Sequence, residues 1–522
     1  MKKRISKILS IAVAAIMILS LAACSKAGTN QQPTANPEPT KSSSGSTKPT
    51  EGPTQKEPST ISVLMTGDNT PAPDNIVLKE LSKRTNVNVD MIYISKNDLA
   101  TKISVMTASD TLPDVFPLSG SEAIEYRDAG LIANVEDLLK EYGPNILANL
   151  GDSLKKAAAN KDGIYLILDA KLPYCMQLNM RTDWLKNLGM ELPTDLDSLY
   201  EVYYAFTYND PDKDGKDDTF GLAVGADPGG FATVFGAYGI PVARNSVKNI
   251  LLDDKITIGQ KHPHYLEAIE YIRKLIKDGL VEPDWGTIPN MDMFSKLWNG
   301  IAGAIEWECV GPTNNWMPSR YVEDPAPTFD FPVIVGPYGD KGTAAAYFSY
   351  STGYVFNAKC KDLASAIRLC DYCMTEEGNE LLYLGIENVM YKWINKEEGT
   401  FEYLGEYKDT AVHRAAGGYC YATFFAPTNR TEERILNKQT REGVAKARAL
   451  GIDYPVIIQP LQTRIDYGSD MDSILQEMYV NLLVTEEDVK TVYDRYIAEW
   501  EKAGGLEWEK EATEQYWREQ GR

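Results

Sequence analysis

The sequence predicts an α/β protein that folds into two lobes. The chain has 522 residues, more than a single hydrophobic core usually serves. From residue 61 onward, apolar-rich strand patterns alternate with helical patterns in a β-α-β-α-β order, which requires a largely parallel sheet with helices on its faces. Apolar residues form 43% of the chain, which suits a globular protein.

Residues 1–23 have the pattern of an export leader. A basic start over residues 1–4 precedes an apolar run over residues 8–19, which is too short for a comfortable membrane span. Leu21-Ala22-Ala23-Cys24 follows and resembles the lipobox of bacterial lipoproteins. The resemblance implies cleavage before Cys24 and acylation of its thiol, as with palmitate, and of its amine, and several acyl chains give stable anchoring. A plain secretory leader that is cut elsewhere is the alternative.

A segment without large apolar side chains follows the leader. Residues 24–60 are rich in Pro, Thr, Ser, Gly and Lys. Such a composition cannot bury enough apolar surface to fold, so we expect a disordered tether. Its reach would be about 35 Å, from the square-root scaling of a flexible chain.

The first folded elements form one α/β unit. Ligands of such sheets bind at the carboxyl ends of the strands. This rule places Gly67, Asp68, Ser119 and Gly120 near a candidate cleft. The expected strands cover residues 61–65, 87–94, 114–116 and 219–224, and the expected helices cover residues 75–84, 98–108, 265–280 and 364–374.

An acidic loop over residues 209–219 predicts a calcium site. Three aspartates at alternate positions followed by Gly215 match the first half of a calcium-loop pattern, because alternate residues of a curling loop converge on one cation. The twelfth position is Gly221 and not Glu, so the loop is not a complete EF-hand. A solvated turn is the alternative, but repulsion among five aspartates favours a structural calcium ion. The expected ligands are Asp210, Asp212, Asp214, the Lys216 carbonyl and Asp218.

Several motifs, in their order along the chain, resemble one family. The sequence has SDTLPDV at 109–115, YRDAGLI at 126–132, RTDWLKNLG at 181–189 and GIENVMYKW at 385–393. They are similar to motifs of the extracellular solute-binding proteins of carbohydrate ABC importers, family 1. The acidic loop stands where a branch resembling alginate-oligosaccharide binding proteins carries its calcium loop, although Thr219 occupies a position where that branch often has Glu.

This resemblance implies a fold and a function. The fold would be of the type II periplasmic-binding-protein kind, with two α/β lobes around a hinge and a ligand cleft. The protein would capture a carbohydrate, an oligosaccharide in particular, and deliver it as a monomer to an ABC transporter permease at the extracellular face of the cell membrane. The implied division is 61–175 and 346–400 for the first lobe, and 176–345 and 401–522 for the second lobe with C-terminal helices.

Candidate ligand residues follow from the shape of a sugar. A pyranose ring has an apolar face and a fringe of hydroxyls, so it needs an aromatic platform with polar side chains at its edge. Each tryptophan has a competing interpretation, because tryptophans more often lie in a core. The expected ligand-binding residues are Gly67, Asp68, Arg181, Asp183, Trp184, Glu306, Trp307, Glu308 and Trp393.

Two other function classes remain open from the sequence. Glu306 and Glu308 alternate along a strand, about 7 Å apart along the backbone, which could suit the acid/base pair of a surface glycoside hydrolase or lyase. A receptor for a peptide or signal ligand could use the same scaffold. The three histidines lie in no recognisable catalytic context, so we favour binding and expect no enzyme activity.

Net charge and cysteine content argue against several classes of partner, metal site and crosslink. The formal net charge of -21 argues against nucleic acid and against lying flat on an anionic membrane, so contact with the membrane would come through the lipid anchor only. It also disfavours a polyanionic ligand unless a local basic patch overrides the global field. A single C-x-x-C makes zinc improbable. We expect no essential disulfide among cysteines 175, 309, 360, 370, 373 and 420.

Overall fold

The computed structural model describes one folded unit within residues 58–522. The leader, Cys24, the tether up to residue 57, Asp68 and Cys309 lie outside the described residues. None of the described helices combines the length and the apolarity that a membrane crossing requires. The described ranges are 58–67, 70–169, 174–287, 292–308, 321–323, 325–347, 352–428 and 430–522.

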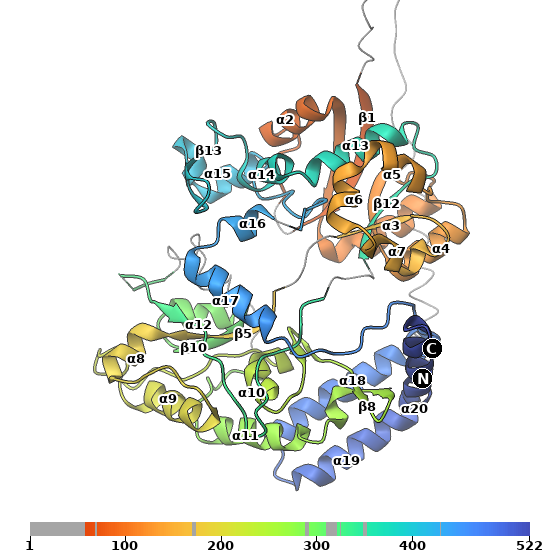
Figure 1. The fold of residues 1–522 in the computed structure, drawn as a ribbon. Coiled ribbons are helices and arrows are strands. Elements are labelled where there is room, and N and C mark those ends of the chain that lie inside the picture. Colours follow the sequence, from red (N-terminus) through yellow and green to blue (C-terminus); the bar gives the residue numbers. More distant parts are fainter. Residues whose placement is uncertain are drawn as a thin grey trace, which may run out of the picture. The chain divides into compact units, whose positions relative to one another are not determined.

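A five-stranded sheet organises the first lobe, which we define as residues 58–169 and 352–428. The strand order is β2-β1-β3-β12-β4, with β1 parallel to β2 and β3, and with β12 antiparallel to β3 and β4. Strand β12 comes from much later in the chain, so the two segments of this lobe share one sheet (Figure 1). The strands are β1 Ser59–Thr66, β2 Val87–Ile94, β3 Val115–Ser119, β4 Leu166–Leu168 and β12 Thr352–Phe356.

Helices cover this sheet, and the first lobe extends further along the chain than expected. The sequence assigned residues 401–522 to the second lobe, but Phe424 and Phe425 pack on Tyr354 of β12, with ring centroids 5.2 and 4.9 Å apart. This apolar contact moves the boundary beyond residue 425. The other elements are α2 Ile76–Thr85, η1 Lys96–Asp98, α3 Leu99–Ala108, α4 Gly120–Asp128, α5 Glu136–Tyr142, α6 Pro144–Leu150, α7 Ser153–Lys156, η2 Ala158–Asn160, α13 Leu363–Cys373, α14 Glu376–Leu384, β13 Tyr391–Asn395, β14 Thr400–Tyr403, η6 Gly405–Lys408 and α15 Thr410–Ala415.

The second lobe, residues 174–347 and 430–522, is built on a smaller sheet. Strand β5 lies between β10 and β11 and is antiparallel to both. The expected strand over residues 219–224 is instead an extended segment with isolated bridges to residues 281, 302 and 305. The elements up to residue 347 are β5 Gln177–Arg181, α8 Thr182–Leu188, α9 Leu196–Tyr208, η3 Pro228–Phe231, α10 Ala232–Ala237, β6 Val242–Ala243, β7 Ser246–Val247, β8 Ile250–Leu252, β9 Lys255–Thr257, η4 Gly259–Lys261, α11 Tyr265–Lys277, α12 Met293–Trp298, β10 Ala304–Trp307 and β11 Phe329–Asp330.

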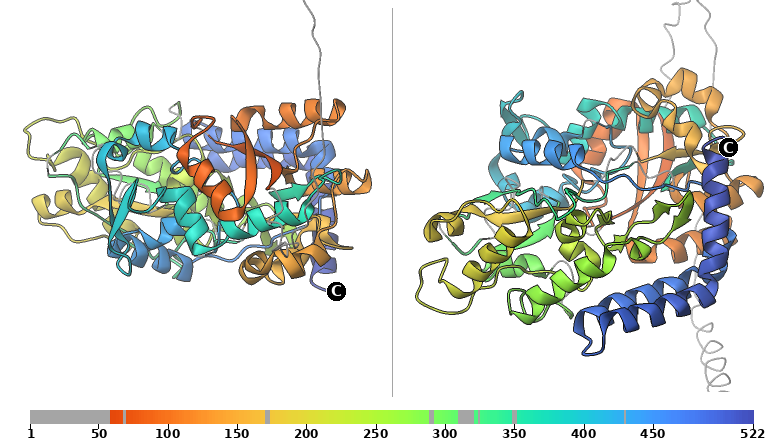
Figure 2. Two further views of the ribbon diagram at one scale, coloured as in Figure 1. Left: turned by 90° about the horizontal axis from the view of Figure 1, so that it is seen from above. Right: turned by 60° about the horizontal axis from the view of Figure 1, so that its bottom comes forward.

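Three long helices complete the second lobe. Helices α18 and α19 lie side by side, and α20 turns away from their direction (Figure 2). The turn falls at Gly504, whose φ of 114° favours glycine. Trp500 and Trp508 meet edge to face across this turn, with centroids 6.0 Å apart. The helices after residue 430 are α16 Thr431–Arg434, α17 Lys438–Ala449, α18 Gln462–Val484, α19 Val489–Trp500, the π-turn η7 Glu501–Gly505 and α20 Leu506–Glu519.

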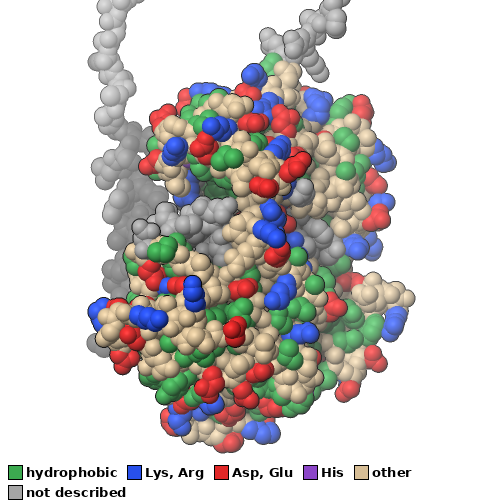
Figure 3. Space-filling model, turned by 60° about the vertical axis from the view of Figure 1, so that its left-hand side comes forward, with side chains coloured by type: hydrophobic (Ala, Val, Ile, Leu, Met, Phe, Trp, Pro, Cys, Tyr) green, Lys and Arg blue, Asp and Glu red, His purple; other side chains and the backbone are tan. Residues whose placement is uncertain are grey.

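The surface carries both signs of charge. On the face drawn in Figure 3, Lys and Arg side chains are interspersed with Asp and Glu side chains over the described residues. The acidic side chains that outnumber the basic ones in this chain therefore do not form a single negatively charged patch on this face.

One carboxyl group lies inside the core of the second lobe. Glu306 of β10 is 2% exposed, and its Oε1 accepts a hydrogen bond of 3.0 Å from the backbone N–H of Thr233. Its Oε2 is buried without a hydrogen-bond partner among the described residues. Burial raises the pKa of Glu306 from 4.5 to about 8, because the charged form loses its hydration and regains only one donor. The side chain is therefore uncharged at neutral pH.

This burial predicts a pH-dependent stability. Because the pKa of Glu306 is higher in the folded than in the unfolded state, the folded state binds this proton more tightly. The resulting contribution to the free energy of unfolding is fully present below pH 4.5 and is lost as pH rises through about 8. We expect Glu306→Gln to reduce this pH-dependent decrease in the free energy of unfolding, by a few kcal/mol at most. Urea unfolding at pH 5, 7 and 9 measures it. Glu191→Gln, at an exposed glutamate, is the control, and an unaltered pH profile for Glu306→Gln would contradict the prediction.

Candidate functional site

A cavity of about 870 Å³ is lined by residues from both lobes. The first lobe contributes residues 119–121, at the carboxyl end of β3 and the start of α4, and Thr352 of β12. The second lobe contributes residues 226–228, the β6–β7 hairpin with its continuation to residue 249, residues 457–461, and side chains of α18, α19 and α20. Ser119 and Gly120 therefore lie at a cleft, as expected from the rule on strand ends.

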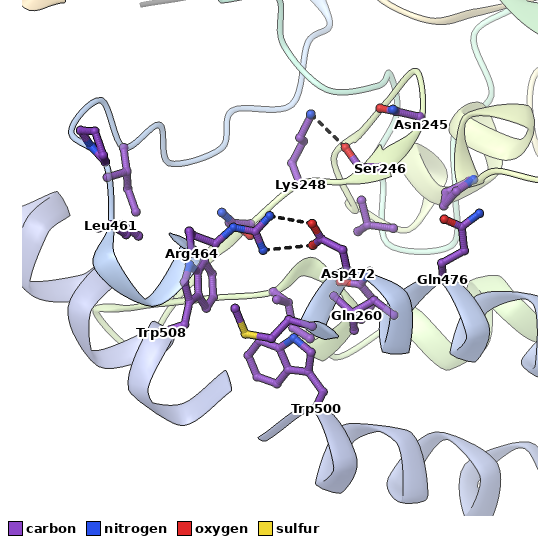
Figure 4. A pocket seen from close by; sticks show the side chains of 18 of the residues that line it. Asn245, Ser246, Lys248, Gln260, Leu461, Arg464, Asp472, Gln476, Trp500 and Trp508 are labelled. Atoms are coloured by element: carbon purple, nitrogen blue, oxygen red, sulfur yellow. Dashed lines mark hydrogen bonds and ion pairs between the residues drawn. The ribbon is translucent and has the colours of Figure 1, made fainter. Parts of the chain in front are cut away.

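Two glycines fix the hairpin in the cavity wall. A Cβ atom at Gly229 would lie 1.8 Å from the backbone oxygen of Arg244, and one at Gly259 would lie 2.3 Å from the backbone oxygen of Lys248. Because backbone cannot be displaced as cheaply as a side-chain tip, only glycine permits η3 and η4 to approach the hairpin this closely. The clamped hairpin presents Asn245, Ser246 and Lys248 to the cavity (Figure 4).

Helix α18 contributes an ion pair. Arg464 donates from its two terminal nitrogens to the carboxylate oxygens of Asp472, at 3.0 and 2.7 Å, as the dashed lines in Figure 4 mark. The two residues are eight positions apart on this helix. This fork geometry leaves the pair without net charge.

The floor of the cavity is apolar. Trp500 and Trp508 are 1% and 4% exposed and belong to the same core cluster as Leu461 and Met471. The Lys261 ammonium lies 5.0 Å from the centroid of the Trp500 ring. The indoles are thus held by packing on their other faces, and their remaining edges line the cavity.

The lining suits a ligand that is rich in hydroxyl groups. Amides and hydroxyls both donate and accept hydrogen bonds, and an apolar floor can contact the apolar parts of a sugar ring. The arrangement can bind and orient such a ligand. The polar lining residues without formal charge include Ser119, Ser121, Asn245, Ser246, Asn249, Gln260, Gln459 and Gln476.

Gly67 lies elsewhere, on a smaller cavity of about 140 Å³ at strand ends of the first lobe. Its backbone N–H donates to the Ile94 carbonyl at 3.1 Å, and a Cβ here would lie 1.7 Å from the hydroxyl oxygen of Tyr93. Tyr383, Tyr419 and other side chains complete the lining. The structure therefore does not bring Gly67 together with the larger cavity.

The expected site residues at the end of β5 and on α8 are engaged within the fold. Trp184 is fully buried and meets Phe206 edge to face at 5.3 Å, so it offers no face to a ligand. Arg181 is 2% exposed, forms ion pairs with Asp183 and Glu323, and lies 4.4 Å over the Trp184 ring. The prediction that Arg181, Asp183 and Trp184 bind ligand gains no support from this geometry, because the guanidinium pairs with two carboxylates and lies over the buried indole.

Trp307 is covered by a cation. Its side chain is 9% exposed, the Arg244 guanidinium lies 4.4 Å from its ring centroid, and Arg244 also donates to Glu308 at 2.8 Å. Trp393 packs edge to face with Phe401 in the β13–β14 hairpin. Neither tryptophan lines the 870 Å³ cavity.

The two glutamates do not form an acid/base pair in a shared cavity. Glu306 is in the core, whereas Glu308 lies beyond the end of β10 and forms an ion pair with Arg244. A hydrolytic mechanism needs both carboxyl groups beside one substrate bond. The geometry therefore gives the hydrolase alternative no support.

The cavity residues of the second lobe were missed for two reasons. Trp500 and Trp508 lie in the C-terminal helices α19 and α20, where a tryptophan ordinarily belongs to the core. The β6–β7 hairpin has strands of two residues, too short for an alternating pattern. The polar turn around Asn245, close after the paired glycines 229 and 230, is the signal that could have indicated it.

The acidic loop curls as expected. One oxygen from each of Asp210, Asp212 and Asp214 lies within 4.8 Å of the others. The Gly215 N–H donates to Asp210, and Gly215 has a φ of 81°. Burial and the neighbouring carboxylates raise the pKa of Asp212, and the Lys216 ammonium contacts Asp214.

The two residues at the end of this loop, Asp218 and Thr219, lie apart from the converging carboxylates. Asp218 is not among the carboxylates that converge. Thr219 is buried and donates to the Phe206 carbonyl at 2.8 Å, so its hydroxyl caps the end of α9. Three convergent oxygen donors fit a hard divalent cation.

Five cysteines are described, and all five are free thiols: Cys175, Cys360, Cys370, Cys373 and Cys420.

Curated relatives are similar to this chain over much of its length. Lipoprotein LipO of Bacillus subtilis is 25% identical over 96% of this chain and 97% of its own length. The polygalacturonan/rhamnogalacturonan-binding protein YtcQ of the same organism is 31% identical over 46% of this chain and 48% of its own length.

Solved structures share the fold. A HMO-binding, ABC-transporter-associated solute-binding protein of Bifidobacterium longum infantis superimposes with a TM-score of 0.68 at 15% identity, over 88% of this chain and 99% of that one. The alginate-binding protein AlgQ2, described as without calcium ion, superimposes with a TM-score of 0.65 at 16% identity, over 88% and 98%. These matches confirm the predicted fold class. The family model of bacterial extracellular solute-binding proteins matches residues 66–380, and this chain belongs to that family.

Proposed function

We propose that this protein captures an oligosaccharide outside the cell and delivers it to an ABC transporter permease. The observation that carries the proposal is the 870 Å³ cavity, which has neutral hydrogen-bonding side chains on its walls and two tryptophans at its floor. The relatives named for polygalacturonan and alginate binding support a carbohydrate ligand. The mechanism is binding followed by movement of the lobes, and no bond is made or broken.

Binding should depend on the amides of the cavity. We expect Asn245→Ala combined with Gln476→Ala to weaken binding of a preferred oligosaccharide at least tenfold. Each removed amide leaves sugar hydroxyls unpaired at about 1–3 kcal/mol, and about 1.4 kcal/mol is a factor of ten. Calorimetric titration against a panel of oligosaccharides measures the affinities. Asn97→Ala, at an exposed amide of the first lobe, is the matched control.

Two outcomes would contradict this function. If no oligosaccharide of the panel binds the wild type, the carbohydrate class is wrong. If chromatography of the titrated samples reveals cleaved sugar that Glu308→Gln abolishes, the hydrolase alternative replaces the receptor.

We further propose a structural calcium ion held by Asp210, Asp212 and Asp214. Their convergent oxygens support the site, and a similar protein is described in a form without calcium ion, which makes calcium relevant to the fold. The Lys216 carbonyl and Asp218 would complete the set after a local rearrangement of the loop. The ion would relieve the repulsion that otherwise opposes this loop.

Chelation should therefore destabilise the protein. An ion at a hundred times its dissociation constant adds about 2.7 kcal/mol to the free energy of unfolding, so EGTA should lower the melting temperature and excess calcium should restore it. Asp212→Asn with Asp214→Asn should abolish the response. Asp253→Asn with Asp254→Asn removes two carboxylates from another turn and should preserve it. Melting curves that do not respond to EGTA would refute the site.

We also propose that Cys24 is the acylated N-terminus of the mature protein. The lipobox-like sequence supports this, and a full-length relative is named a lipoprotein. Cys24→Ala should move the protein from the membrane fraction of its host to the soluble or medium fraction, because the acyl chains supply the anchoring energy. Cys360→Ala should leave fractionation unchanged. Equal membrane partitioning of the Cys24 variant and the wild type would disprove the anchor.

A further inference from the structure

Lys248 is a cation without an anionic partner in the cavity wall. The side chain is half-buried, and its ammonium donates to the Ser246 hydroxyl at 3.0 Å and lies 5.9 Å from the centroid of the Tyr454 ring. Among the described residues, no carboxylate lies within ion-pair distance of it. Burial lowers the pKa of Lys248, because the charged form loses hydration that no carboxylate replaces.

The other charged groups of this wall are already engaged. Asp472 neutralises Arg464 through two hydrogen bonds. The Asp227 carboxylate accepts from the Gly229 N–H at 3.0 Å and so caps η3. Figure 4 shows Lys248 beside Ser246, away from the Arg464–Asp472 pair. Asp227 keeps its negative charge, and the ammonium of Lys248 is the cation of this wall that a ligand carboxylate can pair with.

The first lobe adds a second feature that favours a negatively charged ligand group, the N-terminus of α4. Helix α4 begins at the cavity, where Gly120 and Ser121 line the wall. The Glu122 carboxylate accepts from the Ser119 N–H and hydroxyl, and no described group accepts from the N–H groups of Gly120 and Ser121. Free N–H groups in the first turn of a helix favour an anion. Both lobes thus offer donors suited to a negative group.

We propose that the captured oligosaccharide carries a sugar carboxylate, a uronate, and that Lys248 is the residue that selects for it. This deepens the proposed function and depends on it. A lysine ammonium binds a carboxylate as a point charge and gains most where water is partly excluded. The local cation thereby overrides the acidic net charge of the chain, which by itself disfavours anionic ligands.

The test compares acidic trisaccharides with their neutral counterparts. Trigalacturonate and trimannuronate are titrated into the protein by calorimetry, each beside its methyl ester. We expect Lys248→Met to weaken binding of at least one acid tenfold or more and to leave its ester unchanged. Lys248→Arg should retain most of the affinity for the acid. Lys255→Met, at an exposed lysine on β9, changes the net charge equally and should have no effect.

The outcomes separate this inference from the proposed function. Equal affinity of wild type and Lys248→Met for the acids, or binding of neutral oligosaccharides alone, overturns the selection for a uronate but leaves the carbohydrate receptor intact. Failure of every oligosaccharide, acidic or neutral, overturns both. An equal loss for acid and ester in Lys248→Met also overturns the inference, because it would mean that the lysine only supports the hairpin.

Discussion

The cavity depends on the close approach of backbone to backbone around the β6–β7 hairpin. Gly229 and Gly259 leave no Cβ between the two short helices and the carbonyls of Arg244 and Lys248. A hairpin with two-residue strands has too few ladder hydrogen bonds to hold itself rigid. Contacts with η3 and η4 therefore hold the backbone of the hairpin in place. The same contacts position the polar side chains that the hairpin presents to the cavity.

The opening β-α-β-α-β segment of the first lobe could be predicted from the sequence to within a few residues. Its strands and helices have strong local periodicity, and the strand over residues 87–94 has the expected ends. The later boundary was wrong because Phe424 and Phe425 return to β12 through contacts distant in sequence. Periodicity describes one element at a time and carries no information on which core a late segment joins.

The site was harder to predict than the fold, for a chemical reason. Arg181 and Trp184 have the residue types of a sugar site, yet in the core the guanidinium pairs with two carboxylates and lies over the buried indole. Lys248 looks unremarkable in the sequence, and it stands out only because the fold places it on a cavity wall where no described carboxylate lies within ion-pair distance of it. A side chain can bind a ligand only if its own charge or polar group is not already paired within the protein. Which side chains are paired is decided by the tertiary structure.

The order of the lining residues along the chain has a consequence for maturation. One wall comes from residues near 120, another from residues near 245, and the floor from Trp500 and Trp508. A chain with only its first 490 residues folded lacks Trp500 and Trp508, so it can form the walls of the cavity without the floor. The cavity is complete only after α19 and α20 have docked.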